Sequence, residues 1–337
     1  MKHILSTVTI LTLLFGWTGN AEAQDTVRHR LSSRIDSMLT ERYYRTPFDT
    51  NYVKRPEGKL TLRLRLNQTG NSINVKGTID GLRSKGDLST KNKTTISIGA
   101  SYRGLSAAIA LNPGKLSGSY KDFELNLNYY SRRFSVDASY QKSSTLSGDI
   151  KHGTNVDKLE SGSIDMKMVN ISGTYTFNHR RFSFPAAMTQ SYIQKKSAGS
   201  WLVGVSFLGC SMKTNKKLIE KDPSTPNYKI RFDNYGIGGG YAFNWVPGKH
   251  WLIHLSVMPT VVVYNHNTMS INGERIKGNS IRLNLLFNEH LSVVYNFGPR
   301  YFAGLSLIMN NSIVEDKDLT VNQSKWRARA TMGVRLF

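Results

Sequence analysis

The sequence predicts an all-β fold: a transmembrane, antiparallel, up-and-down β-barrel of about twelve strands that follows a short N-terminal periplasmic segment. Three observations predict it. Apolar residues recur with a period of two over most of the chain, short turns alternate with longer polar connections, and the final stretch, KWRARATMGVRLF, keeps the same period. Barrels of bacterial outer membranes combine these features, because each strand faces lipid on one side and a wet lumen on the other.

The N-terminus has the layout of a secretory signal peptide. A basic start is followed by an apolar run at 4–17 and by the small-residue cleavage pattern Ala-Glu-Ala. The run is shorter than the about 20 residues that a membrane-spanning helix needs. We expect residues 1–23 to be removed on export, 24–56 to form the periplasmic segment, and 57–337 to form a barrel in the outer membrane of a Gram-negative bacterium.

The chain has 337 residues, a formal net charge of +22 and a single cysteine. Such a charge usually indicates nucleic acid or anionic lipid as a partner, and the export signal excludes a cytoplasmic role with nucleic acid. The expected partners are therefore outer-membrane lipids, lipopolysaccharide phosphates and the barrel-assembly machinery. One cysteine excludes an intrachain disulfide and a cysteine-based metal site, and the sequence indicates neither a metal nor another cofactor.

Secondary structure can be assigned in order along the mature chain. Residues 27–42 carry apolar side chains at helical spacing and predict a short helix. The period then changes to two. In KLTLRLRLNQ the leucines share one face and the arginines the other, and the same alternation builds hairpins at 96–111 and 123–140.

Short and long connections between the predicted strands alternate, and an even strand count returns the chain to the side on which the barrel began. The short turns are expected on the periplasmic side, at 103–104, 131–133, 178–181, 246–249 and 298–300. The longer polar stretches are expected to be outer loops, at 69–93, 113–120, 143–163, 213–227, 265–279 and 314–323. Interface aromatics are expected at Tyr129, Trp201, Trp245, Trp251 and Trp326.

One stretch, FSFPAAMTQSYIQKKSAGSW, interrupts the alternation. We expect residues 185–197 to fold into the lumen as a constriction against a glycine stripe on the next strand, because strand glycines mark the close approach of another backbone. A bulged strand with a flexible turn is the alternative. The constriction candidates are Gln190, Gln194, Lys195, Lys196, Gly236, Gly238 and Gly240.

A set of cationic and imidazole side chains falls opposite the apolar residues of the same strands and is therefore predicted to line the lumen. These residues are Arg63, Arg65, His254, Arg282, His290, Arg327, Arg329 and Arg335. They would either favour anionic solutes or hold the barrel together by pairing with lumen acids such as Glu124 and Asp137.

Two His-x-Ser pairs could supply a base and a nucleophile, since residues two apart on a strand share a face. They are His254 with Ser256 and His290 with Ser292. The apolar residues between them turn both pairs inward, and neither has an acid at a fitting position on its own strand. We interpret the pairs as lumen lining and predict that the protein is not an enzyme.

Four blocks resemble the bacterial family catalogued as domain of unknown function 4421. They are FDTNYVKRP (48–56), QSYIQKKSAGSWLVG (190–204), the block at 236–265 that opens GIGGGYAFNW, and VNQSKWRARATMGVRLF (321–337). The resemblance covers nearly all of the mature chain. It implies an outer-membrane barrel of the Bacteroides type and carries no established activity, ligand or catalytic residue.

Three functions remain open at this level. The first is a narrow or partly plugged pore or transporter for small solutes, with anions favoured by the lumen arginines. The second is a structural or surface-interaction barrel that binds lipopolysaccharide or a partner protein. The third is a membrane lipid hydrolase, which would require a His/Ser pair on the lipid face.

Overall fold

A computed structural model describes residues 33–34, 37–38, 40–41, 48–58, 60–79, 82–102, 105–111, 122–221, 227–276, 284–316 and 319–336. The chain divides into two compact units, Met1–Pro47 and Phe48–Phe337. In the first unit the described residues between 33 and 41 are helical and fall within the helix predicted at 27–42. The predicted signal peptide lies outside the described residues. No helix in the described ranges is long and apolar enough to cross a membrane.

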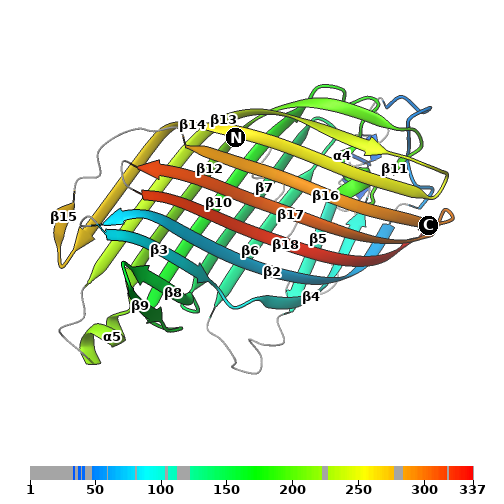
Figure 1. Cartoon of the computed structure of the whole chain (residues 1–337). Coiled ribbons are helices and arrows are strands. Elements are labelled where there is room, and N and C mark those ends of the chain that lie inside the picture. Colours follow the sequence, from blue (N-terminus) through cyan, green and yellow to red (C-terminus); the bar gives the residue numbers. More distant parts are fainter. Residues whose placement is uncertain are drawn as a thin grey trace. The chain divides into compact units, whose positions relative to one another are not determined.

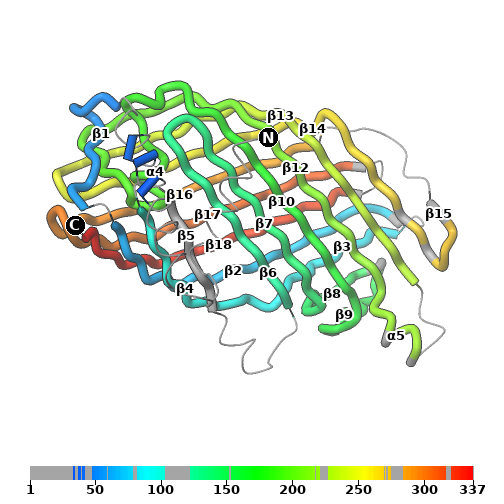
Figure 2. The backbone as a smooth tube through the Cα atoms, turned by 180° about the vertical axis from the view of Figure 1, so that it is seen from behind, coloured from blue at the N-terminus to red at the C-terminus, as the bar shows by residue number. Residues whose placement is uncertain are grey.

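The second unit is built on one curled antiparallel sheet (Figures 1 and 2). Twelve of its strands, counted among the described residues, form the wall. They are β2 (Leu60–Ile79), β4 (Lys93–Tyr102), β5 (Leu105–Leu111), β6 (Phe123–Tyr130), β7 (Phe134–Ser143), β10 (Ile164–Thr176), β12 (Ala198–Thr214), β13 (Tyr228–Trp245), β14 (Trp251–Ile271), β16 (Leu285–Phe297), β17 (Tyr301–Asp316) and β18 (Leu319–Leu336). Neighbours along this series pair in the order β5-β4-β2-β18-β17-β16-β14-β13-β12-β10-β7-β6.

The last strand pairs with the first along its whole length, from Leu319 opposite Gly77 to Leu336 opposite Leu60. This confirms the fold class and explains why the alternation runs almost to the end of the sequence, because an unpaired strand edge is not tolerated in lipid. The sheet continues through β3 (Leu82–Ser89), which pairs with both β2 and β8 (Ser147–His152), and β8 pairs with β9 (Asn155–Leu159). Among the described residues the pairing therefore ends at β6 on one side and at β5 and β9 on the other.

The short turns at 131–133, 178–181, 246–249 and 298–300 all lie at one end of the sheet, here called the turn end. Figure 1 shows this end on the right, beside the C-terminus. The opposite end, here called the far end, carries β9 (Asn155–Leu159), β15 (Glu274–Ile276) and the short helix α5 (Lys216–Lys221). These four short turns are therefore confirmed at one end of the sheet, and the predicted turn at 103–104 and loop at 113–120 lie outside the described residues.

Most of the stretches predicted as long outer loops instead continue the sheet. Strand β2 runs on to Ile79, and β8 and β9 form a hairpin within 143–163. The 20 residues of β2 span roughly 66 Å at about 3.3 Å each, whereas the apolar band of a membrane barrel is about 25 Å tall. The strands therefore extend well beyond the apolar band.

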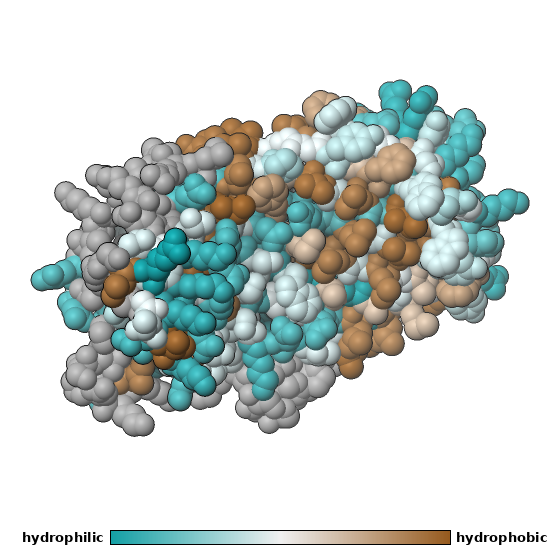
Figure 3. All heavy atoms as spheres, in the orientation of Figure 1, coloured by the Kyte–Doolittle hydropathy of each residue, from teal (hydrophilic) through white to brown (hydrophobic). Residues whose placement is uncertain are grey.

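Along these long strands the inward face changes from polar to apolar, and the outward face changes from apolar to polar. In β2, Leu64 is 55% exposed and Arg63 is 2% exposed, whereas further along the same strand Ile73 is 1% exposed and faces inward. Polar side chains take the outer face where the barrel leaves the apolar band, and apolar ones fill its interior. Because their outer face is polar, these segments have the composition of loops in the sequence. Figure 3 shows the corresponding change on the outer surface, with brown apolar side chains gathered over the right-hand half.

The inverted part of the lumen holds two apolar clusters. The first contains Ile73, Leu146, Met166 and Cys210, and the second contains Met168, Leu208 and Leu286. Both bury side chains from several strands, so they form a small core inside the wall. These clusters occupy the far half of the interior, and two of their residues, Ile73 and Leu146, fall in stretches predicted as outer loops.

Aromatic side chains gather on the outer surface near the turn end. Trp201 is 69% exposed and packs against Tyr241, with ring centroids 5.2 Å apart. Trp251 lies 4.7 Å from Tyr295 and is likewise exposed. Tyr129 and Trp245, 41% and 51% exposed, complete the set that faces outward there. Such a belt beside a band of exposed aliphatic residues is typical of a membrane-spanning barrel.

Candidate functional site

The inward arginines form one patch across the seam between the first and last strands. The register sets Arg327 opposite Thr69, Arg329 opposite Asn67, and Arg65 opposite Thr331. Arg65 and Arg327 are each 9% exposed, Arg335 is 3% exposed, and Arg329 is half-buried. Arg282, the remaining predicted lumen arginine, lies outside the described residues.

Acidic side chains on the opposite wall balance only part of this charge. Lys325 Nζ lies 3.5 Å from Glu124 Oε1, and Lys93 Nζ lies 3.3 Å from Asp122 Oδ2. The Nε and Nη1 atoms of Arg327 have no hydrogen-bond partner, and neither does Nε of Arg65. Buried guanidinium groups of this kind are costly unless an acceptor reaches them.

Asp137, on β7, is the acidic group nearest to this patch, and its oxygens are already engaged. It accepts hydrogen bonds from the Asn128 amide and the Tyr130 hydroxyl. It also accepts from His290, whose Nε2 lies 3.2 Å from Asp137 Oδ2. The carboxylate thus accepts hydrogen bonds from an amide, a hydroxyl and an imidazole, and among the described residues it makes none with a guanidinium.

The segment that interrupts the alternation is buried against the inner face of the wall near the turn end. This segment, residues 182–194, is here called the plug. It contains the short helix α4 (Phe184–Met188), and every plug residue except Ile193 is buried. Helix α4 packs against strands from different parts of the wall, β6, β14 and β16, which places it inside the barrel (Figure 1).

Local sequence explains the shape of the plug. Ser183 accepts a hydrogen bond from the backbone N–H of Ala186 at 3.2 Å, and Pro185 occupies the first turn of α4, where its missing N–H has no cost. The helix ends one turn later, and Gln190 adopts a left-handed conformation with φ of 52°. A helix of five residues leaves most of its carbonyl groups without intrahelical partners.

Wall side chains donate to carbonyl groups of the helix and of the two residues that follow it. The Arg63 guanidinium donates to the Thr189 carbonyl, and Arg335 Nη2 donates to the Gln190 carbonyl at 3.4 Å. Ser292 Oγ donates to the Ala187 carbonyl at 3.1 Å. Two of the predicted lumen arginines, Arg63 and Arg335, therefore hold the plug, whereas Arg65, Arg327 and Arg329 lie beside it on the inner face of the wall.

The segment before the barrel holds the plug from the other side. Strand β1 (Val53–Lys54) pairs with β11 (Ile193–Gln194), and the backbone N–H of Lys195 donates to the Tyr52 carbonyl at 2.7 Å. The predicted periplasmic segment thus ends in a strand that joins the plug.

The glycine stripe does not receive the plug, and this part of the constriction prediction is wrong. A Cβ atom on Gly236 would lie 2.6 Å from Thr260 Cγ2, and one on Gly238 would meet Thr260 and the Pro259 carbonyl. Gly240 likewise faces the backbone of β14. The glycines therefore allow β13 and β14 to approach closely beside a bulge between Tyr235 and Gly236.

Two lysines among the constriction candidates point away from the lumen. Lys195 and Lys196 are exposed, and Lys195 Nζ donates to the Thr50 carbonyl. In contrast, Gln190 and Gln194 are buried within the plug. Gln194 Oε1 accepts from Asn244 Nδ2 at 3.0 Å, so the plug contacts β13 beyond the glycine stripe.

The two His-x-Ser motifs pair across strands and not within them. Because β14 and β16 are antiparallel, Ser256 lies opposite His290 and His254 lies opposite Ser292. Ser256 Oγ is 3.2 Å from His290 Nδ1, and the other ring nitrogen faces Asp137. The acid that faces His290 thus comes from β7 across the lumen, a position that its own strand could not indicate.

This Ser256–His290–Asp137 line has the order of groups found in serine hydrolases. However, Ser256 is 2% exposed and lines neither of the cavities described below. His254 is fully buried between Phe182 and Phe184, with Nδ1 2.7 Å from Asn244 Oδ1. Beside the plug, His254 thus links β14 to β13, and His290 links β16 to β14 and β7.

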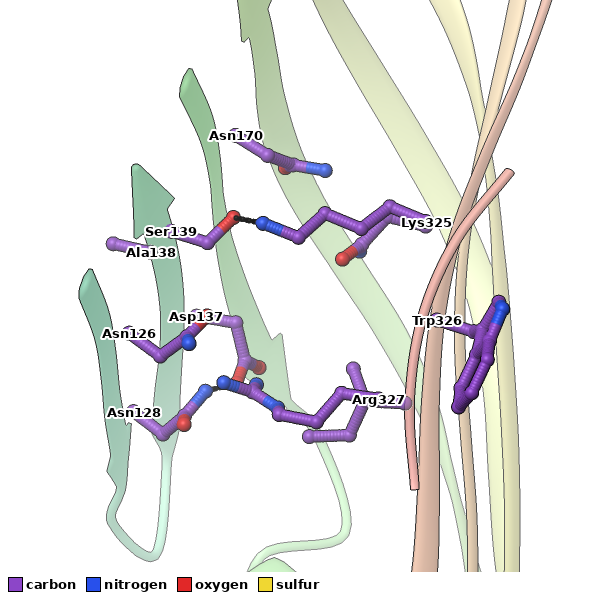
Figure 4. Close-up of a pocket in the computed structure, with 11 residues that line it drawn as sticks. Asn126, Asn128, Asp137, Ala138, Ser139, Asn170, Lys325, Trp326 and Arg327 are labelled. Atoms are coloured by element: carbon purple, nitrogen blue, oxygen red, sulfur yellow. Dashed lines mark hydrogen bonds between the residues drawn. The ribbon is translucent and has the colours of Figure 1, made fainter. Parts of the chain in front are cut away.

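Two cavities follow one another along the interior, among the residues that the structure describes. The first holds about 320 Å³ of empty space, part of it open to solvent, and is lined by Lys325, Arg327, Asp137 and several asparagines. Figure 4 shows Arg327 reaching from β18 toward Asp137 and Asn128, with Lys325 directed at Ser139. The second, of about 280 Å³, shares Asn170, Asn310 and Lys325 with the first and continues toward the far end.

Sequence reasoning missed Lys325 and the asparagines that line these cavities. Lys325 is two residues before Arg327 and therefore on the same face as Arg327 and Arg329, so the period of the final strand indicates that it also faces the lumen. The asparagines lie on four different strands, β6, β10, β16 and β17, and only the curled sheet brings them together. No group of three or more His, Cys, Asp or Glu in the described ranges lies in position to hold a metal ion.

The curled antiparallel sheet, its outward apolar band and its inward polar patch define a membrane-spanning β-barrel with a plug. A family model described as domain of unknown function (DUF4421) matches residues 47–336, and the chain belongs to this family. No curated protein matches the sequence significantly.

Solved structures offer only weak likenesses. The outer membrane protease OmpT from Escherichia coli has a TM-score of 0.38 and 8% identity, covering 83% of this chain and 97% of that one. The translocator domain of the autotransporter NalP from Neisseria meningitidis has a TM-score of 0.32 and 8% identity, covering 93% and 98%. The outer membrane protein OprG from Pseudomonas aeruginosa has a TM-score of 0.26 and 11% identity, covering 83% and 97%. At such scores these likenesses say nothing about the activity of this chain.

Proposed function

We propose that this protein is a gated conduit for small anionic solutes in the outer membrane of a Gram-negative bacterium. The observation that carries the proposal is the pair of buried lumen arginines, Arg65 and Arg327, whose charge exceeds that of the acids around them. Rings of Arg and Lys select anions in pores, since a fixed positive charge in a narrow polar passage lowers the energy of an anion there.

The plug is the gate in this proposal. The wall donates hydrogen bonds to its backbone carbonyl groups from Arg63, Arg335, Ser292 and Asn244, and Phe182 and Phe184 pack against wall rings such as His254. Each such bond stabilises the closed arrangement by only about 0.5–3 kcal/mol. The plug is also continuous with the periplasmic segment through β1 and β11, so a partner or solute that moves this segment would move the plug.

The proposed setting follows from the same surfaces. We infer export by the signal at 1–23, insertion by the barrel-assembly machinery with the turn end in the periplasm, and contact of basic far-end residues with lipopolysaccharide phosphates. We infer no hydrolase activity, because Ser256 is enclosed by the wall and no room for a substrate adjoins its hydroxyl group in the described cavities.

Conductance in planar bilayers tests the proposal. Wild-type protein should carry little current, and a variant in which residues 184–191 are replaced by glycine and serine of equal number should carry much more. That current should prefer anions, and the preference should fall when Arg65→Gln and Arg327→Gln are added. A plug variant that folds and stays electrically silent would contradict the proposal.

A second function, a structural or surface-interaction barrel that binds lipopolysaccharide or a partner protein, is favoured by the apolar clusters in the far half of the lumen. Ile73, Leu146 and Met166 fill the interior there and oppose passage of a charged solute. This alternative predicts that the plug variant remains silent, and that replacing exposed far-end lysines such as Lys151 and Lys167 weakens binding to lipopolysaccharide in a sedimentation assay.

A further inference from the structure

Two neighbouring turns at the turn end carry a dense cluster of cations. Residues 131–133 read Ser-Arg-Arg and follow β6, residues 178–181 read Asn-His-Arg-Arg and follow β10, and neither turn contains an acidic residue. Strands β7 and β10 pair as far as these turns, with Phe134 opposite Tyr175. The Thr176 N–H then donates to the Arg133 carbonyl at 2.8 Å. The register therefore sets the two basic turns side by side.

Three guanidinium groups of these turns, here called the turn cluster, lie close enough to affect one another. They are Arg132, Arg133 and Arg180, of which Arg133 and Arg180 are exposed. Burial lowers the pKa of Arg132, and the positive charges of Arg133 and Arg180 lower it further. Asp49 Oδ2 lies 3.3 Å from Arg181 Nε, so this carboxylate engages the fourth arginine of the two turns. An anion that reaches the turn cluster would relieve the repulsion within it.

Aromatic side chains adjoin the turn cluster on the outer face of the wall. Phe134 and Phe177 are 55% and 56% exposed, and the ring of Tyr175 lies between them, 5.2 Å from each centroid. The backbone N–H of Phe177 donates to the carbonyl of Trp201, which belongs to the outward aromatic belt. The cations therefore lie directly beyond rings of the kind that mark the headgroup level of a membrane.

This combination of groups fits a lipid with a negatively charged headgroup. Guanidinium groups bind phosphate oxygens through charge-assisted hydrogen bonds, and basic pockets beside a membrane bind anionic headgroups. The exposed rings offer an apolar surface to the upper part of the acyl chains. A soluble phosphate or an acidic protein would use only the cations, whereas a phospholipid uses both the cations and the rings.

We propose that the turn cluster binds the phosphate of an anionic phospholipid. The acyl chains of that lipid lie against Phe134 and Phe177 on the outer face. With the turn end in the periplasm, as proposed above, the lipid belongs to the inner leaflet of the outer membrane. The site lies outside the lumen and does not depend on the conduit.

Lipid-specific quenching of one tryptophan tests the site. Full-length mature protein carrying Trp245→Phe, Trp251→Phe and Trp326→Phe keeps Trp201, beside the site, as its one tryptophan. It is reconstituted in phosphatidylcholine bilayers that contain a fraction of lipid with brominated acyl chains, which quench tryptophan on contact. Brominated phosphatidylglycerol should bind beside Trp201 at least about fivefold better than brominated phosphatidylcholine, since each basic residue near an anionic headgroup contributes about fivefold. The preference should fall as salt is added.

Paired variants make the assignment specific. Arg133→Gln with Arg180→Gln should reduce the preference to about twofold or less, because two of the three cations are lost. Lys249→Gln with Arg300→Gln removes the same charge from two other exposed turns at the same end and should leave the preference unchanged. Arg133→Lys with Arg180→Lys keeps the charge and should retain most of the preference. Heat-modifiable gel mobility checks the folding of each variant, and Arg180→Gln alone serves if the double glutamine variant does not fold.

Four results would overturn the proposal. They are equal quenching by the two lipids in the unsubstituted turns, an equal loss in the two glutamine pairs, and a preference that soluble glycerol 3-phosphate abolishes. The last is binding to purified peptidoglycan that depends on Arg133 and Arg180 without any lipid preference, which would assign the turn cluster to a cell-wall polymer. A preference for phosphatidylglycerol that only the Arg133 and Arg180 pair removes would establish the site.

Discussion

Replacing Asp137 with alanine should destabilise the barrel strongly, because one carboxylate satisfies three buried donors. These are the Asn128 amide and the Tyr130 hydroxyl, both from β6, and the His290 ring from β16. Each donor left without an acceptor costs about 1–3 kcal/mol. Water in the adjoining cavity can reach part of the vacated space, so each donor should cost about 1–2 kcal/mol, and we expect a loss of about 3–6 kcal/mol in the free energy of unfolding.

Asp137→Asn should cost less, about 1–2 kcal/mol, because its carbonyl oxygen still accepts while its amide group faces a donor. Asp149→Ala is the control, since Asp149 is exposed on β8 and should change stability by no more than about 0.5 kcal/mol. The assay is reversible urea unfolding in lipid bilayers, followed by tryptophan fluorescence. An Asp137→Ala variant within about 1 kcal/mol of wild type would show that these hydrogen bonds do not hold the walls together.

Three further predictions test the fold. Leu64→Arg, on the apolar outer face, should cost about 2–4 kcal/mol in bilayer unfolding, whereas Thr78→Arg, on the same face beyond the apolar band, should be nearly neutral; equal costs would contradict the inverted alternation. Gly240→Ala should impair folding, judged by heat-modifiable gel mobility, because its Cβ would meet the neighbouring backbone, while Gly248→Ala, with open space around it, should fold normally. Cys210, 2% exposed, should resist maleimide until the protein is unfolded, and rapid labelling of the native protein would refute its place in the far-half core.

Much of the wall was predictable from local pattern. Leu62, Leu64 and Leu66 alternate with Arg63 and Arg65, and the structure places the leucines outward and the arginines inward. The prediction failed beyond the apolar band, where water and not lipid surrounds the wall. There the inward position on the same strand is the apolar Ile73, and the polar outer face has the composition of a loop.

The candidate site was predictable only in part. Inward phase identified Arg327 as a lumen residue, since phase depends on its own strand. It could not show that Arg63 donates to the plug while Arg327 is left without a partner. It likewise placed His290 with Ser292, whereas the antiparallel register joins His290 to Ser256.

The sequence by itself determined the class of fold and, within the apolar band, the face on which each strand residue lies. The two-residue period and its phase can be seen within a single strand, because lipid outside the wall requires apolar side chains at the outward positions within the apolar band. Only the tertiary structure decided which inward side chains meet. His290 reaches Asp137 across 153 positions of sequence, and the plug meets arginines from the first and last strands of the wall, because the curled sheet sets distant strands side by side and face to face.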